Sequence, residues 1–150
     1  EGDDYIVGGD QFDDINGNMG NDTCISGGGD DWVVGGKDND SLVGGTGANL
    51  VYGNLGNDTC EGGAGDDIVR GGQDNDSLSG ADTFNTFAEA GIDRILDFNA
   101  GEGDRVLLAP GTVFTVSQVG ADTVVSMAAG QVVLVNVTMS SLPPGWIFGA

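Results

Sequence analysis

Histidine is absent from this chain of 150 residues, and lysine and arginine together contribute only four residues. Without histidine, a nucleophile elbow or a cysteine beside a base, the sequence offers no nucleophile with an activating partner. We therefore expect a protein that is not an enzyme. A glycosidase-like pair of carboxylates is the catalytic alternative that the composition leaves open.

Basic residues and long apolar runs are also scarce. The 24 acidic residues set a formal net charge of -20. A surface this acidic repels the phosphates of nucleic acid, so we expect no nucleic-acid partner. No apolar stretch is long enough to form a transmembrane segment.

Glycine, by contrast, is abundant, with 29 residues, and it follows a strict period. From Gly8 to Ser79 the chain repeats every nine residues, eight times without an insertion, and a partial copy, EGDDYIV, comes before them. The copies share the frame GGxGxDxUx, where U is apolar. In order they read GGDQFDDIN, GNMGNDTCI, SGGGDDWVV, GGKDNDSLV, GGTGANLVY, GNLGNDTCE, GGAGDDIVR and GGQDNDSLS.

This nonapeptide resembles the repeat of the RTX (repeats-in-toxin, hemolysin-type) proteins, and the resemblance covers about half of the chain. It implies an all-β fold, a right-handed parallel β-roll that binds calcium. It also implies a route out of the cell. RTX proteins stay unfolded in low cytosolic calcium, pass a type I secretion channel and fold outside.

The frame itself predicts alternating turns and short strands. Glycines at the first, second and fourth slots permit positive φ, and the xUx stretch is long enough only for a brief strand. If each turn reverses the chain, eighteen residues make one coil, and equivalent residues stack at roughly 4.8 Å. Gln11, Asp38 and Asp74 replace the fourth-slot glycine, so we expect a different local geometry in those turns.

The sixth slot holds an aspartate or its amide in every repeat. Stacking sorts these residues into two rows, Asp4, Asp22, Asp40, Asp58 and Asp76 in the first, and Asp13, Asp31, Asn49 and Asp67 in the second. Carboxylates this close repel one another unless a cation lies between successive turns. Two carboxylates and several turn carbonyls form an all-oxygen ligand set that suits Ca²⁺. Alternatively, these residues are only turn formers, or they mark disorder.

Neighbouring pairs predict four sites in the first row and three in the second, and therefore about seven calcium ions. The two sites that share Asn49 should be the weaker pair, because an amide brings no charge. After Ser79 the frame slips by three residues, and GADTF then ends a terminal repeat with Asp82 in the sixth slot and Phe84 in the eighth.

Charge and composition predict that folding and metal binding are one event. Without metal, the net charge of -20 and the 29 glycines favour an expanded chain. About seven calcium ions would reduce the net charge to roughly -6. Sites tuned to extracellular calcium have Kd values of about 10⁻⁴ to 10⁻³ M.

The eighth slots are apolar and should point inward as two stacks that form the core. One stack is Ile6, Cys24, Leu42, Cys60 and Leu78, and the other is Ile15, Val33, Val51 and Val69. Cys24 and Cys60 are two coils apart, which is about 9.6 Å and too far for a disulfide. We expect two free, buried thiols, with an intermolecular bridge as the alternative.

Outward slots form an apolar strip on an otherwise acidic roll, made of Trp32, Val34, Leu50, Tyr52 and Ile68. A strip of this size should be covered by something. One hypothesis is that the last sixty or so residues fold back on it. The other is that it contacts another domain or a second copy of the chain.

Beyond the repeats the periodicity changes to alternating runs, which predict antiparallel strands at 94–98, 104–108, 113–119, 122–127 and 131–137. We therefore divide the chain into an RTX roll, residues 1–82, and a β-rich capping or secretion domain, residues 83–150. The stretch GIDRILDFNAGEGDRVLL resembles the C-terminal domain of serralysin-type RTX proteins. Asp93, Asp97 and Asp104 bind a further calcium, or else they cap turns and pair with Arg94 or Arg105.

Two functions follow from these observations. The first is a calcium-binding folding and export module of a secreted, extracellular or cell-surface bacterial protein. The alternative is a self-assembling extracellular structural protein that forms a filament or surface layer through the strip or the roll ends. Residue 1 is a glutamate inside a repeat, so we expect a piece of a longer protein.

Overall fold

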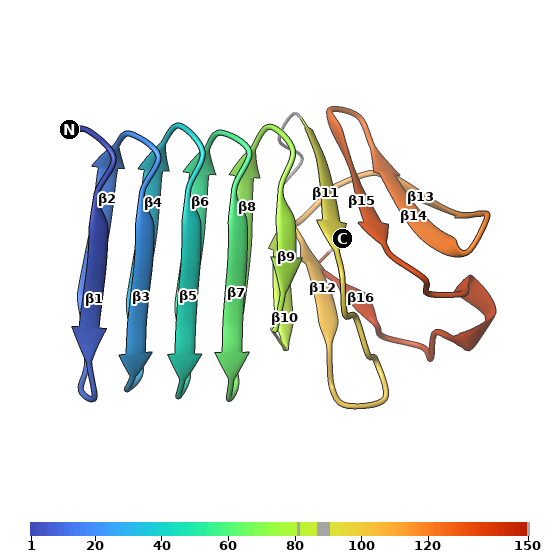
Figure 1. Ribbon diagram of the computed structural model, residues 1–150. Coiled ribbons are helices and arrows are strands. Elements are labelled where there is room, and N and C mark those ends of the chain that lie inside the picture. Colours follow the sequence, from blue (N-terminus) through green and yellow to red (C-terminus); the bar gives the residue numbers. More distant parts are fainter. Residues whose placement is uncertain (81, 87–90, 150) are drawn as a thin grey trace.

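The computed structural model describes residues 1–80, 82–86 and 91–149. Two sheets pack face to face along the molecule, and in the repeats the chain crosses from one to the other at every turn (Figure 1). One sheet holds β1 (Tyr5–Gly9), β3 (Thr23–Gly28), β5 (Ser41–Thr46), β7 (Thr59–Ala64), β9 (Ser77–Ser79), β11 (Gly91–Ile95), β13 (Phe114–Val119), β14 (Asp122–Met127) and β15 (Gly130–Leu134). The other holds β2 (Asp14–Met19), β4 (Trp32–Lys37), β6 (Leu50–Leu55), β8 (Ile68–Gln73), β10 (Thr83–Thr86), β12 (Arg105–Leu108) and β16 (Ile147–Phe148).

Residues eighteen apart are partners within each sheet, which confirms the parallel β-roll. Cys24 of β3 pairs with Leu42 of β5, and Leu42 pairs with Cys60 of β7. From β1 to β10 every described pairing is parallel. The predicted frame slip is also present, because Phe84 pairs with Val69, fifteen residues before it.

The turns need left-handed backbone at the second and fourth slots but not at the first. Gly45 and Gly47 have φ values of 96° and 118°. Asp38 and Asp74, in the fourth slot, keep this conformation at 78°, whereas Gln11 does not, so only the turn at Gln11 departs as expected. The expectation of positive φ at the first slot is wrong, because no described first-slot glycine has a positive φ. There the absence of a side chain leaves space for the carboxylate of the same turn.

The inward eighth slots form the core, as predicted. Val33, Val51, Val69, Cys24 and Cys60 have no exposed surface. Both cysteines are free thiols, as expected. The core continues without a break into the C-terminal third through Ile95, Val106, Leu108, Val125 and Leu134.

The C-terminal third extends the roll instead of folding back over it (Figure 1). β11 pairs in parallel with β9, β12 with β10, and β16 with β12, so the antiparallel expectation is wrong for the runs at 94–98 and 104–108. It holds for β13, β14 and β15, which form an antiparallel meander. One 3₁₀ helix, η1 (Met139–Ser141), follows. The domain boundary between residues 82 and 83 stays a prediction, and both sheets continue from one side of it to the other.

Among the described residues there is no helix long and apolar enough to cross a membrane.

Candidate metal centre

The sixth-slot residues form two rows along the turns, one on each side of the roll, as the register predicts. Six aspartates and Asn49 are 0 to 3% exposed: Asp22, Asp31, Asp40, Asp58, Asp67 and Asp76. At the two ends the side chains are more open. Asp4 is exposed, and Asp13 and Asp82 are partly buried.

One carboxylate oxygen of each of these six buried aspartates accepts a hydrogen bond from the previous coil. Oδ1 of Asp40 accepts the backbone N–H of Asp22 at 2.8 Å, and Oδ1 of Asp58 accepts that of Asp40 at 2.9 Å. The second row repeats the pattern, and Oδ1 of Asp67 accepts the N–H of Asn49 at 2.8 Å. These bonds fix the side-chain torsions, so each carboxylate has one oxygen committed to the backbone.

The other oxygen, Oδ2, is buried and has no hydrogen-bond partner in all six of these buried aspartates. In five of the six turns it lies against the first-slot glycine, and beside Asp22, Asp58 and Asp67 a carbonyl oxygen of the next coil lies at the same position. A Cβ on Gly53, for example, would collide with Oδ2 of Asp58 and with the carbonyl oxygen of Gly71. An unpaired buried anion is costly, and carboxylate and carbonyl oxygens are the ligands that Ca²⁺ prefers. The residues present therefore fit calcium.

Burial and mutual repulsion oppose the charged form of these carboxylates. Burial, the larger cause, and the charges of neighbouring aspartates raise the pKa of Asp40, Asp58 and Asp67 to about 6. The pKa of Asp76 is raised to about 7 by the same causes, and among the neighbouring charges Asp93 contributes most. The rows would therefore be stabilised by any cation that neutralises them.

The first-slot glycines make room for this carboxylate, which yields a testable prediction. Gly53→Ala should destabilise the calcium-loaded roll by about 1–3 kcal/mol, because the new methyl group overpacks the site. Gly9→Ala is the control, since its Cβ would meet nothing closer than 3.9 Å. Thermal unfolding in calcium measures both variants, and equal losses would contradict the steric role of Gly53.

Sequence reasoning missed a second ladder, in the fifth slot of the first row. The side-chain oxygen of Asn39 accepts both the backbone N–H, at 2.8 Å, and the side-chain N–H, at 3.2 Å, of Asn57. Asn21 and Asn57 receive the same pair of bonds from the next coil. Asparagine recurs at this slot every eighteen residues, and that recurrence is the signal that could have revealed the ladder. It holds neighbouring turns in register without any metal.

Two carboxylates beyond the repeats occupy positions equivalent to the sixth slot. The N–H of Arg94 donates to the Asp76 carbonyl and that of Arg105 to the Asp82 carbonyl, both at 2.8 Å, as the N–H of Ser77 does to Asp58 at 2.9 Å. Asp93 and Asp104, the residues just before these arginines, therefore continue the first and second rows, and both are less than 10% exposed.

The turn that carries Asp97 and Asp104 is held by hydrogen bonds. Oδ2 of Asp97 accepts the N–H of Gly80, and Oδ2 of Asp104 accepts that of Asn99, both at 2.7 Å. The Arg105 guanidinium donates to backbone carbonyls, including that of Gly103 at 2.9 Å. The turn-capping alternative for Asp97 and Asp104 is therefore present. Across the described residues, no group of three acidic or thiol side chains converges as a metal cluster, so the ligand sets proposed here depend on carbonyl oxygens.

The apolar strip lies on the outer face of the seven-stranded sheet and is not covered by the described C-terminal residues. Trp32, Val34, Leu50 and Tyr52 line a shallow groove of about 200 Å³, and Ile68 pairs with Leu50 beside it. Trp32 is 53% exposed and meets the ring of Phe12 edge-on at 6.3 Å. Its role in an interaction remains a prediction.

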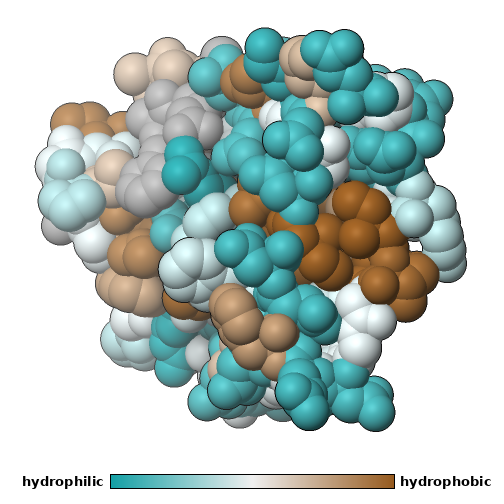
Figure 2. Space-filling model, turned by 90° about the vertical axis from the view of Figure 1, so that its left-hand side faces the viewer, coloured by the Kyte–Doolittle hydropathy of each residue, from teal (hydrophilic) through white to brown (hydrophobic). Residues whose placement is uncertain are grey.

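The roll end at β1 and β2 also exposes apolar side chains, with Val7 at 59% and Phe12 at 60%. Figure 2, which faces this end, shows apolar atoms gathered in one area and surrounded by hydrophilic residues.

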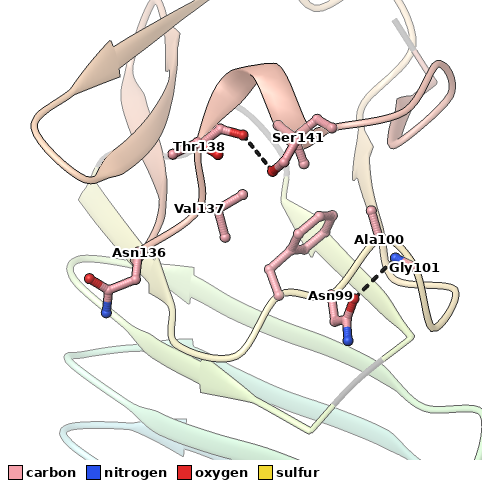
Figure 3. A pocket seen from close by; sticks show the side chains of 9 residues that line it. Asn99, Ala100, Gly101, Asn136, Val137, Thr138 and Ser141 are labelled. Carbon is pink, nitrogen blue, oxygen red and sulfur yellow. Dashed lines mark hydrogen bonds between the residues drawn. The ribbon is translucent and has the colours of Figure 1, made fainter.

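A hollow of about 380 Å³ lies in the C-terminal third, between Phe98, Ala100, Val137 and Leu142 (Figure 3). Its polar side chains bond locally. Oγ of Ser141 donates to the Thr138 carbonyl at 2.7 Å, and Oδ1 of Asn99 accepts the N–H of Gly101 at 3.1 Å. The described residues that line it include no acid, base or thiol.

Comparison with known proteins agrees with the repeat region. The sequence matches the RTX calcium-binding nonapeptide repeat family in four copies, at residues 1–33, 25–60 and 61–86. This match ends before the stretch that resembles serralysin-type domains, so that second resemblance stays a prediction. No curated protein matches the chain.

Two of the solved structures that are similar to the chain are the following. The extracellular lipase LipA from Serratia marcescens is 18% identical with a TM-score of 0.44; the match covers all of this chain and 40% of the lipase. The AlgE6R3 subunit of the Azotobacter vinelandii mannuronan C5-epimerase is 25% identical with a TM-score of 0.33, and the match covers all of this chain and 80% of that subunit. The family match spans more than half of the sequence, and the chain therefore belongs to the family of RTX calcium-binding nonapeptide-repeat proteins.

Proposed function

We propose that this chain is the calcium-binding module of a secreted bacterial protein, and that it folds when it meets calcium after export by a type I channel. The observation that carries the proposal is the set of six buried Oδ2 atoms without a partner. Beside Asp22, Asp58 and Asp67 a carbonyl oxygen of the next coil lies at the same position. A row without cations therefore contains repeated unpaired anions. The module acts by binding and folding rather than by catalysis.

The ligands we propose are the sixth-slot aspartates of the repeats, Asp4, Asp13, Asp22, Asp31, Asp40, Asp58, Asp67, Asp76 and Asp82, together with turn carbonyls. Calcium bound between coils would neutralise charge that otherwise drives the turns apart. Because the ladder aligns residues that are eighteen apart, an unfolded chain has no preformed site, and binding free energy becomes folding free energy.

A calcium titration of the EDTA-stripped chain tests the proposal. Circular dichroism should change from coil to sheet at about 10⁻⁴ to 10⁻³ M calcium. Light scattering, followed in the same titration, should show constant mass. The absence of any transition would overturn the metal-coupled folding, whereas a transition with rising mass would instead favour the self-assembling structural protein.

Self-assembly has less support than the folding module. It draws on the exposed groove at Trp32 and on the open roll end, and neither feature identifies a partner. Trp32→Asp separates the two functions, because a folding module should keep its calcium transition and its mass when this exposed side chain becomes charged.

A further inference from the structure

Asn49 is the one amide among the buried sixth-slot residues, and its orientation is fixed. Its Oδ1 accepts the backbone N–H of Asp31 at 3.0 Å, as Oδ1 of Asp58 accepts that of Asp40. Turning the amide over would point an N–H group at another N–H group. The Nδ2 atom must therefore occupy the position that Oδ2 has in the aspartate turns.

That position lies between two successive coils. In the turn that ends at Asp58, the space beside Gly53 contains Oδ2 and the carbonyl oxygen of Gly71. In the turn that ends at Asn49, the space beside Gly44 contains the carbonyl oxygen of Gly62 and, 3.0 Å from the Cβ position, the Asn49 Nδ2. A hydrogen-bond donor has replaced the acceptor that would bind a cation.

The donor already has partners there. Nδ2 of Asn49 donates to the Gly47 carbonyl at 3.4 Å. The amide also acts on the Asp67 carboxylate of the next coil, whose pKa it lowers against the larger effect of burial, and the Asn49 backbone N–H donates to Oδ1 of Asp67 at 2.8 Å. Each of the six buried aspartates has one oxygen without a hydrogen-bond partner. The Asn49 side chain has no buried polar atom without a partner. The amide hydrogens carry positive partial charge, so a calcium ion beside them would be repelled.

We propose that the space between the turn of Asn49 and the turn of Asp67 holds no calcium ion, and that the Asn49 amide links these coils in its place. The inference rests on the calcium binding proposed above and locates a break in the second row. The second-row calcium sites on either side of this empty space would then bind their ions independently of each other.

The space on the other side of Asn49 is different. There the Oγ of Ser26, which stands in a first slot, donates to the Gly44 carbonyl, while Oδ2 of Asp31 remains buried without a partner. This space keeps an unpaired carboxylate oxygen that a cation would neutralise, although its Gly44 carbonyl already accepts the hydrogen bond from Ser26. The two spaces beside Asn49 are thus not an equal pair, since only the one toward Asp67 is closed by hydrogen bonds.

Counting bound calcium at saturation by equilibrium dialysis tests the proposal. Asn49→Asp restores an Oδ2 atom and should add one ion per full chain relative to the unsubstituted protein. Asn16→Asp is the matched control, because it adds the same charge at an exposed position of β2 and should add none. An unchanged count in Asn49→Asp would overturn the proposal.

If the Asn49→Asp variant does not fold, Asn49→Ala provides a second test of the proposal. It should leave the ion count unchanged and lower the melting temperature, because Oδ1 bonds to the backbone and binds no ion. Loss of one ion would overturn the proposal. The outcome is separable from the proposed function, which fails only if the unsubstituted chain binds no calcium or does not fold with it.

Discussion

Asp58→Asn is expected to remove at least one calcium ion from the first row and to shift the folding transition to higher calcium. Asp58 is 2% exposed and lies between Asp40 and Asp76, so it faces two inter-coil spaces. Asparagine preserves the bond from the Asp40 N–H but exchanges Oδ2 for a donor. At calcium about 100-fold above Kd, the loss of one ion removes about 2.7 kcal/mol of folding free energy.

Asp66→Asn is the matched control for Asp58→Asn. Asp66 is an exposed fifth-slot residue in a neighbouring turn, so the charge change is the same but no buried oxygen is lost. Calcium titrations followed by circular dichroism should separate the two variants, with the control close to the unsubstituted chain. Equal midpoints for both variants would show that sixth-slot carboxylates do not carry the binding.

Acidification is expected to promote folding of the calcium-free chain, contrary to the usual behaviour of proteins in acid. The carboxyl pKa is raised from 3.8 to about 6 in Asp40, Asp58 and Asp67, and to about 7 in Asp76. The folded state therefore binds protons more tightly than the unfolded state. Stability is gained as pH falls through 7 and 6 toward 4, and it is lost again as pH rises, by roughly 1.4 kcal/mol per pH unit for each carboxylate.

Circular dichroism in EDTA at pH 5 and pH 7.5 measures this effect, with more sheet expected at pH 5. The calcium-loaded chain should show the opposite trend, because protons compete with calcium for the same oxygens. A calcium-free chain that loses sheet between pH 7.5 and pH 5 would contradict the burial of unpaired carboxylates.

The repeat region was predictable because its period fixes both the turns and the side-chain directions. Once eighteen residues make a coil, the partners of Cys24, the inward position of Val51 and the row that contains Asp58 follow without further information. The pairing of Phe84 could be predicted from the same frame after one slip of three residues. The calcium site was accessible to sequence reasoning because the same residues recur at the same slot.

Two kinds of feature could not be predicted from the sequence. Some lie beyond the nine-residue repeats, and for others two structural explanations produce the same sequence pattern. The alternation at β11 and β12 is the same for parallel and antiparallel strands, and only the register of Arg94 with Ser77 shows which applies. Gly53 was assigned to backbone conformation, although its role is to leave space for Asp58. The hypothesis that the C-terminal residues cover Trp32 was wrong for the described part of that region, because its strands find their partners at the end of the roll.

The rates at which the two buried cysteines are chemically modified report on local opening of the roll. Neither Cys24 nor Cys60 has exposed surface, and burial, with the nearby aspartates adding to it, raises the pKa of Cys24 to about 11. A closed coil therefore protects its sulfur from alkylating reagents, while an opened coil exposes a reactive thiol. Since Leu42 separates the two sulfurs, each reports on its own section of the solenoid, and their relative rates of modification record the order in which the sections open.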